Sequence, residues 1–368
     1  MAFQQQRNQE AFGAAGLVQD LVEILRSSSM FLPGDSRASN SDIIEAAACA
    51  LANLLPLHSP NVEKLIEVGG LEVLFQILSS SHSIDLLDAD QATLIQANAA
   101  NALANTFALV GTNHIEIVHG VENATLSASP HHTCLHVLLP RSFARRLVML
   151  CAAPLSTARR AASLLLGNLA CNSHLRNELG HLGAVEALWS VSSEHQNSAE
   201  RATALWALSN LVWCNSANQD RCGQFLLGLL TNCAISCRTI STRLGQNACS
   251  LLECAFAVCL VANAVYFHDS NRILVETATG ALKNLVSLSG ADKPLAVREP
   301  ALRCLSSLTA TDRGAKRVAF AGDKASACAS LVNAAGDSSL GSESARIRRL
   351  GAAALVNMCS LVDSHEDV

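Results

Sequence analysis

The sequence predicts an all-α fold, specifically a right-handed α-solenoid (superhelix) of stacked helical repeats. Its 368 residues exceed the roughly 250–300 that one compact core usually takes. It is 50% hydrophobic but only 4% aromatic and 15% charged. Ala and Leu are abundant, both are strong helix formers, and small Ala side chains let helices approach closely. The third observation is a short helical motif that recurs along the chain.

The recurring motif is a run of small and apolar residues around a central Asn or Ser. Good copies are AACALANLL, AANALANTF, ASLLLGNLA, ALWALSNLV, ATGALKNLV and GAAALVNMC, with weaker copies at residues 255–264 and 301–309. In the first copy, counted from Asn53, small or apolar residues stand at positions −6, −3, −2 and +1. This i, i+3, i+4, i+7 spacing is one face of an α-helix. The motif therefore predicts one long, buried helix per copy.

A second recurring element precedes several of these helices. A Gly break is followed by an amphipathic helix and a Ser-rich loop, as in Gly13–Ser29, Gly69–Ser81 and Leu182–Glu194. A shorter helix such as NVEKLIEVGG stands upstream. One unit is thus a short helix, a Gly turn, a second helix, a polar loop and the long Asn-bearing helix. The 42 residues from Asn168 to Asn210 match the ~40–47 of three-helix repeat units.

The motif positions divide the chain into three parts. Residues 1–12 are predicted to be a polar tail, residues 13–362 an array of about six to seven units, and residues 363–368 a C-terminal tail. Insertion loops are expected near 80–90 and 111–140. Residues 14–25 are expected to be a second helix without a first, which fits either a truncated array or a polar cap. Between residues 213 and 310, either Asn263 or Asn284 could mark the long helix.

With its Gly turn and the AxxALxNL pattern, this three-helix unit resembles the armadillo repeat family over most of the chain. Residues 204–223 are most similar to importin-alpha and β-catenin-type repeats. The resemblance implies that the third helices line a concave groove, where we expect a peptide-binding row that includes Trp206. The Asn residues of this row are Asn53, Asn105, Asn168, Asn210, Asn284 and Asn357.

An Asn amide offers both a hydrogen-bond donor and an acceptor, so it can pair with the backbone of an extended peptide. Pockets between the helices would then select peptide side chains. The structural alternative is that each Asn bonds to the backbone of an adjoining turn and braces the repeats. The two roles are compatible, and the sequence leaves both open.

We therefore predict a non-enzymatic scaffold that binds a protein or an extended peptide. The alternative is an importin-alpha-like import receptor for basic cargo. Such a receptor would carry a Trp four residues before several Asn residues, where cation–π contacts hold cationic side chains. Only Trp206 does so here. The equivalent residues elsewhere are Cys49, Asn101, Leu164, Gly280 and Ala353.

Charge and cysteine usage exclude other classes of protein. The net charge is −5, which does not indicate a nucleic-acid binder. The most apolar stretch, Cys254–Phe267, is shorter than the roughly 20 residues that cross a membrane, and residues 1–10 lack the apolar core of a signal peptide. The 14 cysteines show no disulfide-type spacing, which favours a reducing compartment, cytoplasmic or nuclear.

No catalytic motif, cofactor or metal site is predicted. His131, His132, Cys134 and His136 are residue types that bind zinc, but they are crowded into six positions with no second cluster nearby. Asp85, Asp88 and Asp90 lack the spacing and the Gly of a calcium-binding loop. We interpret both stretches as solvated loops.

Overall fold

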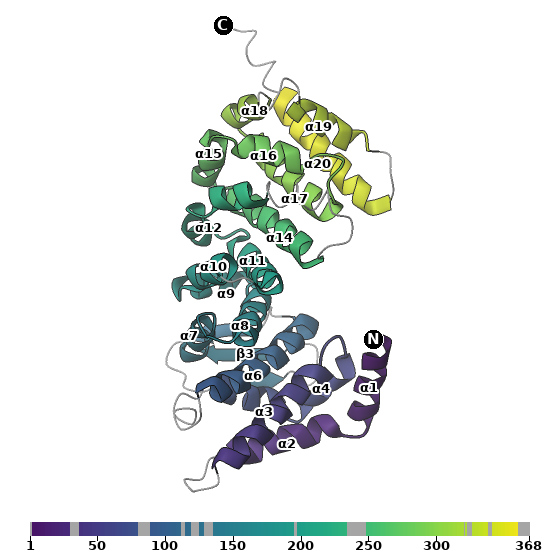
Figure 1. The fold of residues 1–368 in the computed structure, drawn as a ribbon, viewed down its shortest axis with the longest axis vertical. Helices are drawn as coiled ribbons and strands as arrows, with labels where there is room; N and C mark the ends of the chain where they lie inside the picture. The colour runs from purple at the N-terminus through teal and green to yellow at the C-terminus, as the bar shows by residue number, and fades with distance from the viewer. Residues whose placement is uncertain are drawn as a thin grey trace. The chain divides into compact units, whose positions relative to one another are not determined.

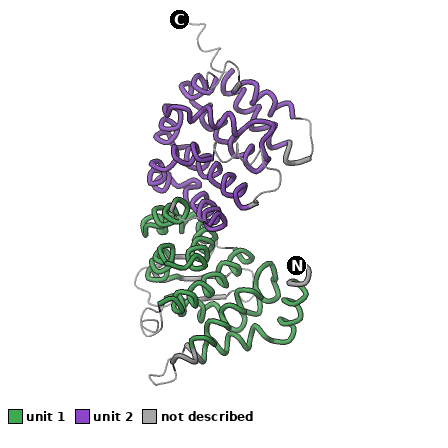
Figure 2. Tube along the Cα trace, in the orientation of Figure 1, with its two compact units in different colours: residues 1–195 green, residues 196–368 purple. Residues whose placement is uncertain are grey.

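The computed structural model describes residues 2–29, 37–79, 89–111, 115–118, 125–128, 135–194, 197–233, 248–319, 321, 326–337 and 341–359. Helices make up nearly all of these residues (Figure 1). The chain divides into two compact units, residues 1–195 (unit 1) and residues 196–368 (unit 2) (Figure 2). Each unit is a stack of helical repeats.

Unit 1 begins with two complete three-helix repeats. In each, a first and a second helix pack against a longer third helix, and the third helices α3 and α6 pack side by side. The first repeat consists of α1 (Ala2–Ala14), α2 (Leu17–Ser29) and α3 (Arg37–Leu54). The second consists of α4 (Ser59–Glu67), α5 (Gly70–Ser79) and α6 (Ala89–Val110).

The third repeat of unit 1 contains a small sheet where the pattern calls for a first helix. β1 (Ile115–Val118) pairs in parallel with β3 (Leu135–Pro140), and β2 (Thr125–Ala128) pairs antiparallel with β3. β1 packs against the first helix of the next repeat, as first helices do elsewhere. An insertion loop was predicted for residues 111–140, and the prediction is wrong for the residues that form these three strands.

The remaining helices of unit 1 continue the pattern. α7 (Arg141–Leu150) is a second helix, and α8 (Ser156–Leu169) is a third helix that packs against α6. α9 (Ser173–His181) and α10 (Ala184–Glu194) are the next first and second helices. α9 is the helix that β1 contacts.

Unit 2 stacks four third helices in chain order: α11 (Ser198–Val212), α14 (Ala248–Val265), α17 (Leu295–Leu308) and α20 (Gly341–Cys359). The first helices are α12 (Ser216–Gly223), α15 (Asp269–Thr277) and α18 (Asp312–Ala319). The second helices are residues 226–233, α16 (Ala281–Leu288) and α19 (Ser326–Ala335). α14 therefore marks the long helix of its repeat.

The buried faces follow the predicted motif. In α11, Ala204, Ala207, Leu208 and Leu211 stand at −6, −3, −2 and +1 from Asn210, and all are fully buried. Burying one Leu side chain contributes about 1.5–3 kcal/mol, while the alanines allow α11 and α14 to approach closely. The face predicted from the motif spacing is thus confirmed as a packing face of α11.

The predicted Gly turns are confirmed between first and second helices. Gly69 follows α4 and Gly183 follows α9, with φ angles of 70° and 89°. These values lie in the left-handed region, which strains any residue with a Cβ. Both turns let a short first helix fold back along its second helix.

The prediction of an N-terminal tail is wrong, and two other predicted segments lie outside the described residues. Residues 1–12 were predicted to be a tail, but Ala2–Ala14 form the helix α1. α1 is the first helix of the repeat whose second helix, α2, was expected to have no first helix before it. The Gln9 side chain fixes α1, because its Nε2 donates to the carbonyl oxygens of Asn53 and Pro56 at 3.0 and 3.1 Å. Residues 80–88 and 363–368 lie outside the described residues.

Candidate peptide-binding face

Third helices that pack between two others, such as α6 and α17, leave a stripe open to solvent. In α6 the stripe consists of Leu94, Asn98, Asn101 and Asn105, and the residues between them toward the core are mostly buried. In α17, Arg303 and Ser307 are likewise accessible at the places of Asn101 and Asn105. We call this set the third-helix stripe and number its positions from the Asn or Ser of the motif. It is the face that a ligand could reach.

In unit 1, two Asn residues of the predicted row brace neighbouring third helices. Asn105 Nδ2 donates to the carbonyl of Ala52 at 3.0 Å, and Asn168 Nδ2 donates to the carbonyl of Ala104 at 2.8 Å. In both cases the acceptor is the residue just before the Asn of the preceding repeat. Asn168 is only 9% exposed, so its amide is largely committed to this contact.

The same bond recurs in unit 2, at Asn263. Its Nδ2 donates to the carbonyl of Ser209 at 2.9 Å and lies 2.8 Å from the Ser209 hydroxyl. Ser209 again precedes the Asn of the preceding repeat. Asn357 makes a weaker contact, 3.4 Å from Nδ2 to Thr309 Oγ1. Asn263 is therefore the member of the row that belongs to α14.

Asn284 does not belong to this row. It lies on α16, the eight-residue second helix of its repeat, which packs against α17 rather than taking a third-helix place. Its motif, ALKNLV, copies the local pattern, but a Gly at φ 80° caps the helix start. The prediction of Asn284 as a groove residue is corrected: Asn263 is its replacement.

The other predicted residues lie on the open stripe. Asn53 is exposed, and its Nδ2 donates to Cys49 O of its own helix at 3.0 Å. Trp206 and Asn210 are half-buried and stand one turn apart on α11. Position −4 carries a solvent-accessible side chain in every third helix: Cys49, Asn101, Leu164, Trp206, Cys259, Arg303 and Ala353.

Unit 2 contains an aromatic and cationic cluster that the sequence analysis missed. The rings of Trp213 and Tyr266 stack with centroids 4.9 Å apart and planes 16° from parallel. The guanidinium of Arg303 lies over the Trp213 ring, 5.8 Å from its centroid, and Nη2 is 3.1 Å from Cys259 Sγ. With Ser307 aligned on the Asn of the other copies, Arg303 stands at position −4, where an import receptor would carry Trp.

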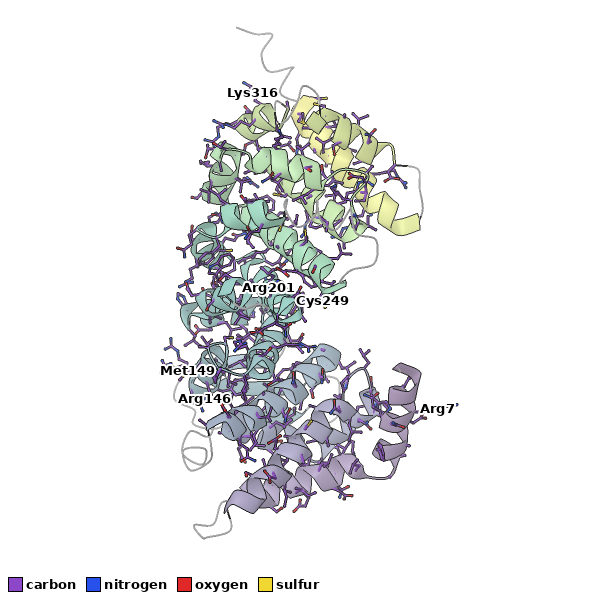
Figure 3. The ribbon with its side chains drawn as sticks, in the orientation of Figure 1. Arg7, Arg146, Met149, Arg201, Cys249 and Lys316 are labelled. Atoms are coloured by element: carbon purple, nitrogen blue, oxygen red, sulfur yellow. The ribbon has the colours of Figure 1, made fainter. Side chains whose placement is uncertain are left out.

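Ion pairs join third helices near their first turns. Arg201, labelled in Figure 3, lies on α11. It holds Glu253 on α14 through two bonds, Nε to Oε1 at 2.9 Å and Nη2 to Oε2 at 2.8 Å. The hydrogen bond to Glu253 raises the pKa of Arg201 above its usual value. Arg346 on α20 pairs with Glu299 on α17 at 3.1 Å. Both pairs hold adjacent third helices in register at the edge of the stripe.

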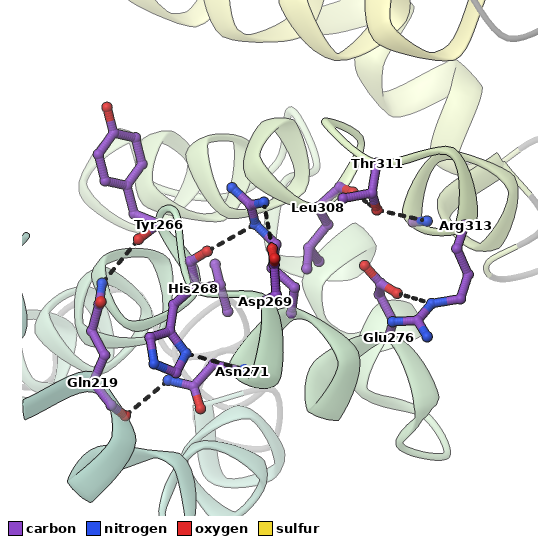
Figure 4. Close-up of polar contacts among 12 residues, drawn as sticks. Gln219, Tyr266, His268, Asp269, Asn271, Glu276, Leu308, Thr311 and Arg313 are labelled. Atoms are coloured by element: carbon purple, nitrogen blue, oxygen red, sulfur yellow. Dashed lines mark hydrogen bonds and ion pairs between the residues drawn. The ribbon is translucent and has the colours of Figure 1, made fainter. Parts of the chain in front are cut away.

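First helices are joined by a separate hydrogen-bond network (Figure 4). Asn271, 3% exposed at the start of α15, donates from Nδ2 to the carbonyls of Gln219 and Ala264 at 2.9 and 3.0 Å. Gln219 Nε2 in turn donates to the carbonyls of Asn263 and Tyr266. The ring Nδ1 of His268 accepts from the Asn271 backbone N–H and caps α15.

Unit 1 repeats this network with different residues of the same types. Asn61 Nδ2 donates to the carbonyls of Gln9 and Leu54 at 3.1 and 2.8 Å, and His58 caps the helix through Nδ1. The turns before these caps hold Leu57 and Phe267 at φ 56° and 50°. The signal in the sequence is the shared pattern LHSPN and FHDSN, which was not recognised as a motif.

Neither a metal site nor a membrane-spanning helix is found among the described residues. No group of three or more His, Cys, Asp or Glu side chains is arranged to hold a metal within the part of the chain that the structure describes. His131, His132 and Cys134 lie outside that part, and the His136 side chain is also not described. No described helix combines the length and apolarity needed to cross a bilayer.

Short first helices, Gly turns, second helices and long third helices braced by Asn define the repeat. This is the armadillo-type fold. The sequence matches no family model and no curated protein. Among solved structures, the crystal structure of an engineered protein from the Northeast Structural Genomics Consortium aligns at 19% identity and a TM-score of 0.64. The alignment covers 94% of this chain and 71% of that one.

A designed armadillo repeat protein also aligns, over 93% of this chain and 99% of its own, at 16% identity and a TM-score of 0.44. Identities this low bear on the fold alone. The chain is an α-solenoid in which a small sheet replaces one first helix. A fold of this kind does not determine function, which depends on the side chains of this chain.

Proposed function

We propose that this armadillo-type array is a non-enzymatic scaffold that binds an extended segment of a partner protein along the third-helix stripe. The observation that supports the proposal is the repeated opening of the stripe at position −4. Third helices packed between two others, such as α6 and α17, bury most of their remaining surface, and position −4 is accessible in each described third helix. Within each unit, a regularly spaced row of accessible side chains suits a ligand that is itself extended.

The row would not bind through all its Asn residues alike. Asn168 and Asn263 are 9% and 5% exposed and already donate to the preceding third helix. We assign ligand contact instead to the accessible members, Asn53, Asn105, Asn210 and Asn357. Trp206 adds a flat apolar surface, which is the kind of side chain that most often dominates a binding interface.

A receptor for basic cargo is not proposed. Such a groove needs Trp residues in successive repeats, whereas position −4 carries Trp206 alone and a cation, Arg303, two third helices later. We propose a reducing compartment, the cytoplasm or nucleus, because the 14 cysteines show no disulfide-type spacing in the sequence.

Selection of random peptides on the full chain tests the proposal. A displayed library of peptides of about 12 residues, at ~3.3 Å per residue, reaches across neighbouring helices packed 8–10 Å apart. Peptides enriched on the wild-type chain are then synthesised and titrated by fluorescence polarisation. Trp206→Ala is expected to weaken peptides that bind unit 2, and Asn101→Ala those that bind unit 1, about tenfold or more if the side chains are central contacts.

The chain supplies matched control variants away from the stripe. Trp189 is half-buried on the second helix α10, and Asn177 is exposed on the first helix α9. Trp189→Ala and Asn177→Ala should leave peptide affinity within about twofold, well under 1 kcal/mol. A library that yields no enriched peptide, or peptides that bind all four variants equally, would refute binding along the stripe.

A further inference from the structure

Arg303 occupies the centre of the third-helix stripe in unit 2 with most of its donors unused. A guanidinium carries five N–H donors. Among the described residues, Arg303 bonds only to Cys259 Sγ, a weak acceptor, at 3.1 Å, and its buried Nε has no partner. The Trp213 ring supports one face of the guanidinium. The group is therefore positioned and desolvated without a counter-charge.

The carboxylates nearest this face are already paired. Glu253 is held by Arg201 through two short bonds, and Glu299 pairs with Arg346 at 3.1 Å. Arg303 and Arg349 have no carboxylate within 4.0 Å in the described ranges. Arg349 is exposed and donates only to the Ala345 carbonyl of its own helix. The stripe of unit 2 therefore carries excess positive charge, although the whole chain is net negative.

Apolar side chains flank these cations on the same stripe. Trp206 on α11 and Phe256 on α14 are half-buried, and Leu252 on α14 is 45% exposed. An apolar surface beside an unneutralised arginine favours a ligand that combines carboxylates with apolar side chains. It disfavours a basic ligand, whose cations would meet Arg303 in a site of reduced dielectric.

We infer that the third-helix stripe of unit 2 binds an acidic, extended peptide of a partner protein, with a peptide carboxylate seated on Arg303. This inference rests on the proposed function, since it assigns a ligand chemistry to the same stripe. Arginine binds a carboxylate through two parallel bonds, and the aromatic stack beneath it keeps the guanidinium plane fixed. Arg349, on α20, adds longer-range attraction for further acidic residues.

The test is a peptide selection on the full chain, carried out in parallel on wild type, Arg303→Gln, Arg303→Glu and Lys283→Glu. Lys283 is an exposed cation of the same unit on the second helix α16, so it controls for net charge. Folding of each variant is checked by circular dichroism and thermal unfolding. Wild type and Lys283→Glu should enrich peptides rich in Asp and Glu.

Quantitative binding then assigns the carboxylate to Arg303. The best acidic peptide should bind Arg303→Gln about 10- to 100-fold more weakly, as expected for loss of a charge-assisted pair, and Lys283→Glu within about twofold. Its affinity for wild type should fall as salt rises. Arg303→Glu should instead select peptides that contain Lys or Arg, because the charge preference is reversed.

The two proposals fail in different ways. Enriched peptides without acidic residues, or acidic peptides that bind Arg303→Gln as well as wild type, would overturn the role of Arg303 while leaving the stripe as a peptide site. An absence of enriched peptides on every variant would overturn the scaffold proposal itself, and the role of Arg303 with it.

Discussion

The tight fit between Gly223 and Asn271 should make two substitutions strongly non-additive. Gly223 ends α12, and a Cβ built there would lie 2.7 Å from Asn271 Oδ1, closer than side-chain atoms normally approach. The substitution Gly223→Ala therefore has to displace the Asn271 amide. That amide donates to two backbone carbonyls, those of Gln219 and Ala264.

The magnitude follows from these bonds. Each net hydrogen bond contributes about 1 kcal/mol, so Asn271→Ala should cost about 2 kcal/mol or more, because two buried carbonyls lose their donor. Gly223→Ala should lose part of the same energy and regain about 0.5–1 kcal/mol of helix propensity. We expect a net loss of roughly 1–2 kcal/mol in the wild-type background, against the usual benefit of Ala over Gly in a helix.

In the Asn271→Ala background the obstructing oxygen is gone. Gly223→Ala should then be neutral or stabilising by about 0.5–1 kcal/mol, giving a coupling of about 2 kcal/mol between the two sites. Gly228→Ala is the matched control, because a Cβ at that glycine meets nothing within 4 Å. Its effect should be the same in both backgrounds.

Urea unfolding followed by circular dichroism gives the stability of the four cycle members. Because repeat arrays can unfold in parts, hydrogen exchange of residues 216–223 and 269–277 provides a local free energy of opening. Effects of Gly223→Ala and Asn271→Ala that add within about 0.5 kcal/mol would refute the reasoning. Gly13 and Asn61 offer a second instance, because a Cβ added at Gly13 would clash with Asn61 Oδ1.

Three further outcomes are expected. Burial raises the pKa of Cys222 from 9.0 to about 12. At pH 8.5, mass spectrometry should therefore find iodoacetamide on exposed Cys49 but on Cys222 only when urea is added. The stability that the neutral Cys222 thiol contributes should be complete below pH 9.0 and lost as the pH rises toward 12. Gly280 has a φ of 80°, and a Cβ added there meets nothing within 4 Å. Gly280→Ala should still lower the free energy of unfolding in urea by about 1–2 kcal/mol because of backbone strain, and an unchanged stability would contradict this. A double-mutant cycle of Arg201→Met and Glu253→Gln should give a coupling of about 1 kcal/mol that shrinks in 1 M salt, and salt-independent coupling would contradict an ionic contribution.

The third helices and Gly turns could be predicted because their signals are local. The spacing around Asn210 encodes a buried helical face, and Gly69 and Gly183 mark turns that need a left-handed backbone. Neither depends on which other segment packs nearby. Every long helix that carries a good Asn motif was found this way, except that ALKNLV at Asn284 was given the wrong place in its repeat.

The elements that were missed depend on partners far away in the sequence. The middle of α1 is polar and lacks an apolar stripe, and what fixes the helix is the contact of Gln9 with the end of α3, more than forty residues later. β1 becomes a strand only because β3 pairs with it across a long connection. Asn263 and Asn284 share a local pattern, and only the packing of the 18-residue α14 between α11 and α17 separates them.

The role of each Asn in the row also depends on its surroundings rather than on its type. An amide has two N–H donors and an acceptor, so bracing uses only part of its capacity. At Asn168 and Asn263, burial keeps the remaining donor and acceptor of the amide away from a ligand. Asn105 is half-exposed, so it can brace the neighbouring third helix and contact a ligand at the same time. Recognition along this stripe would therefore rely less on a uniform ladder and more on position −4, where the side chain changes from helix to helix. A ligand that matches Trp206 and Arg303 in the right order is then selected by sequence, which uniform backbone contacts could not achieve.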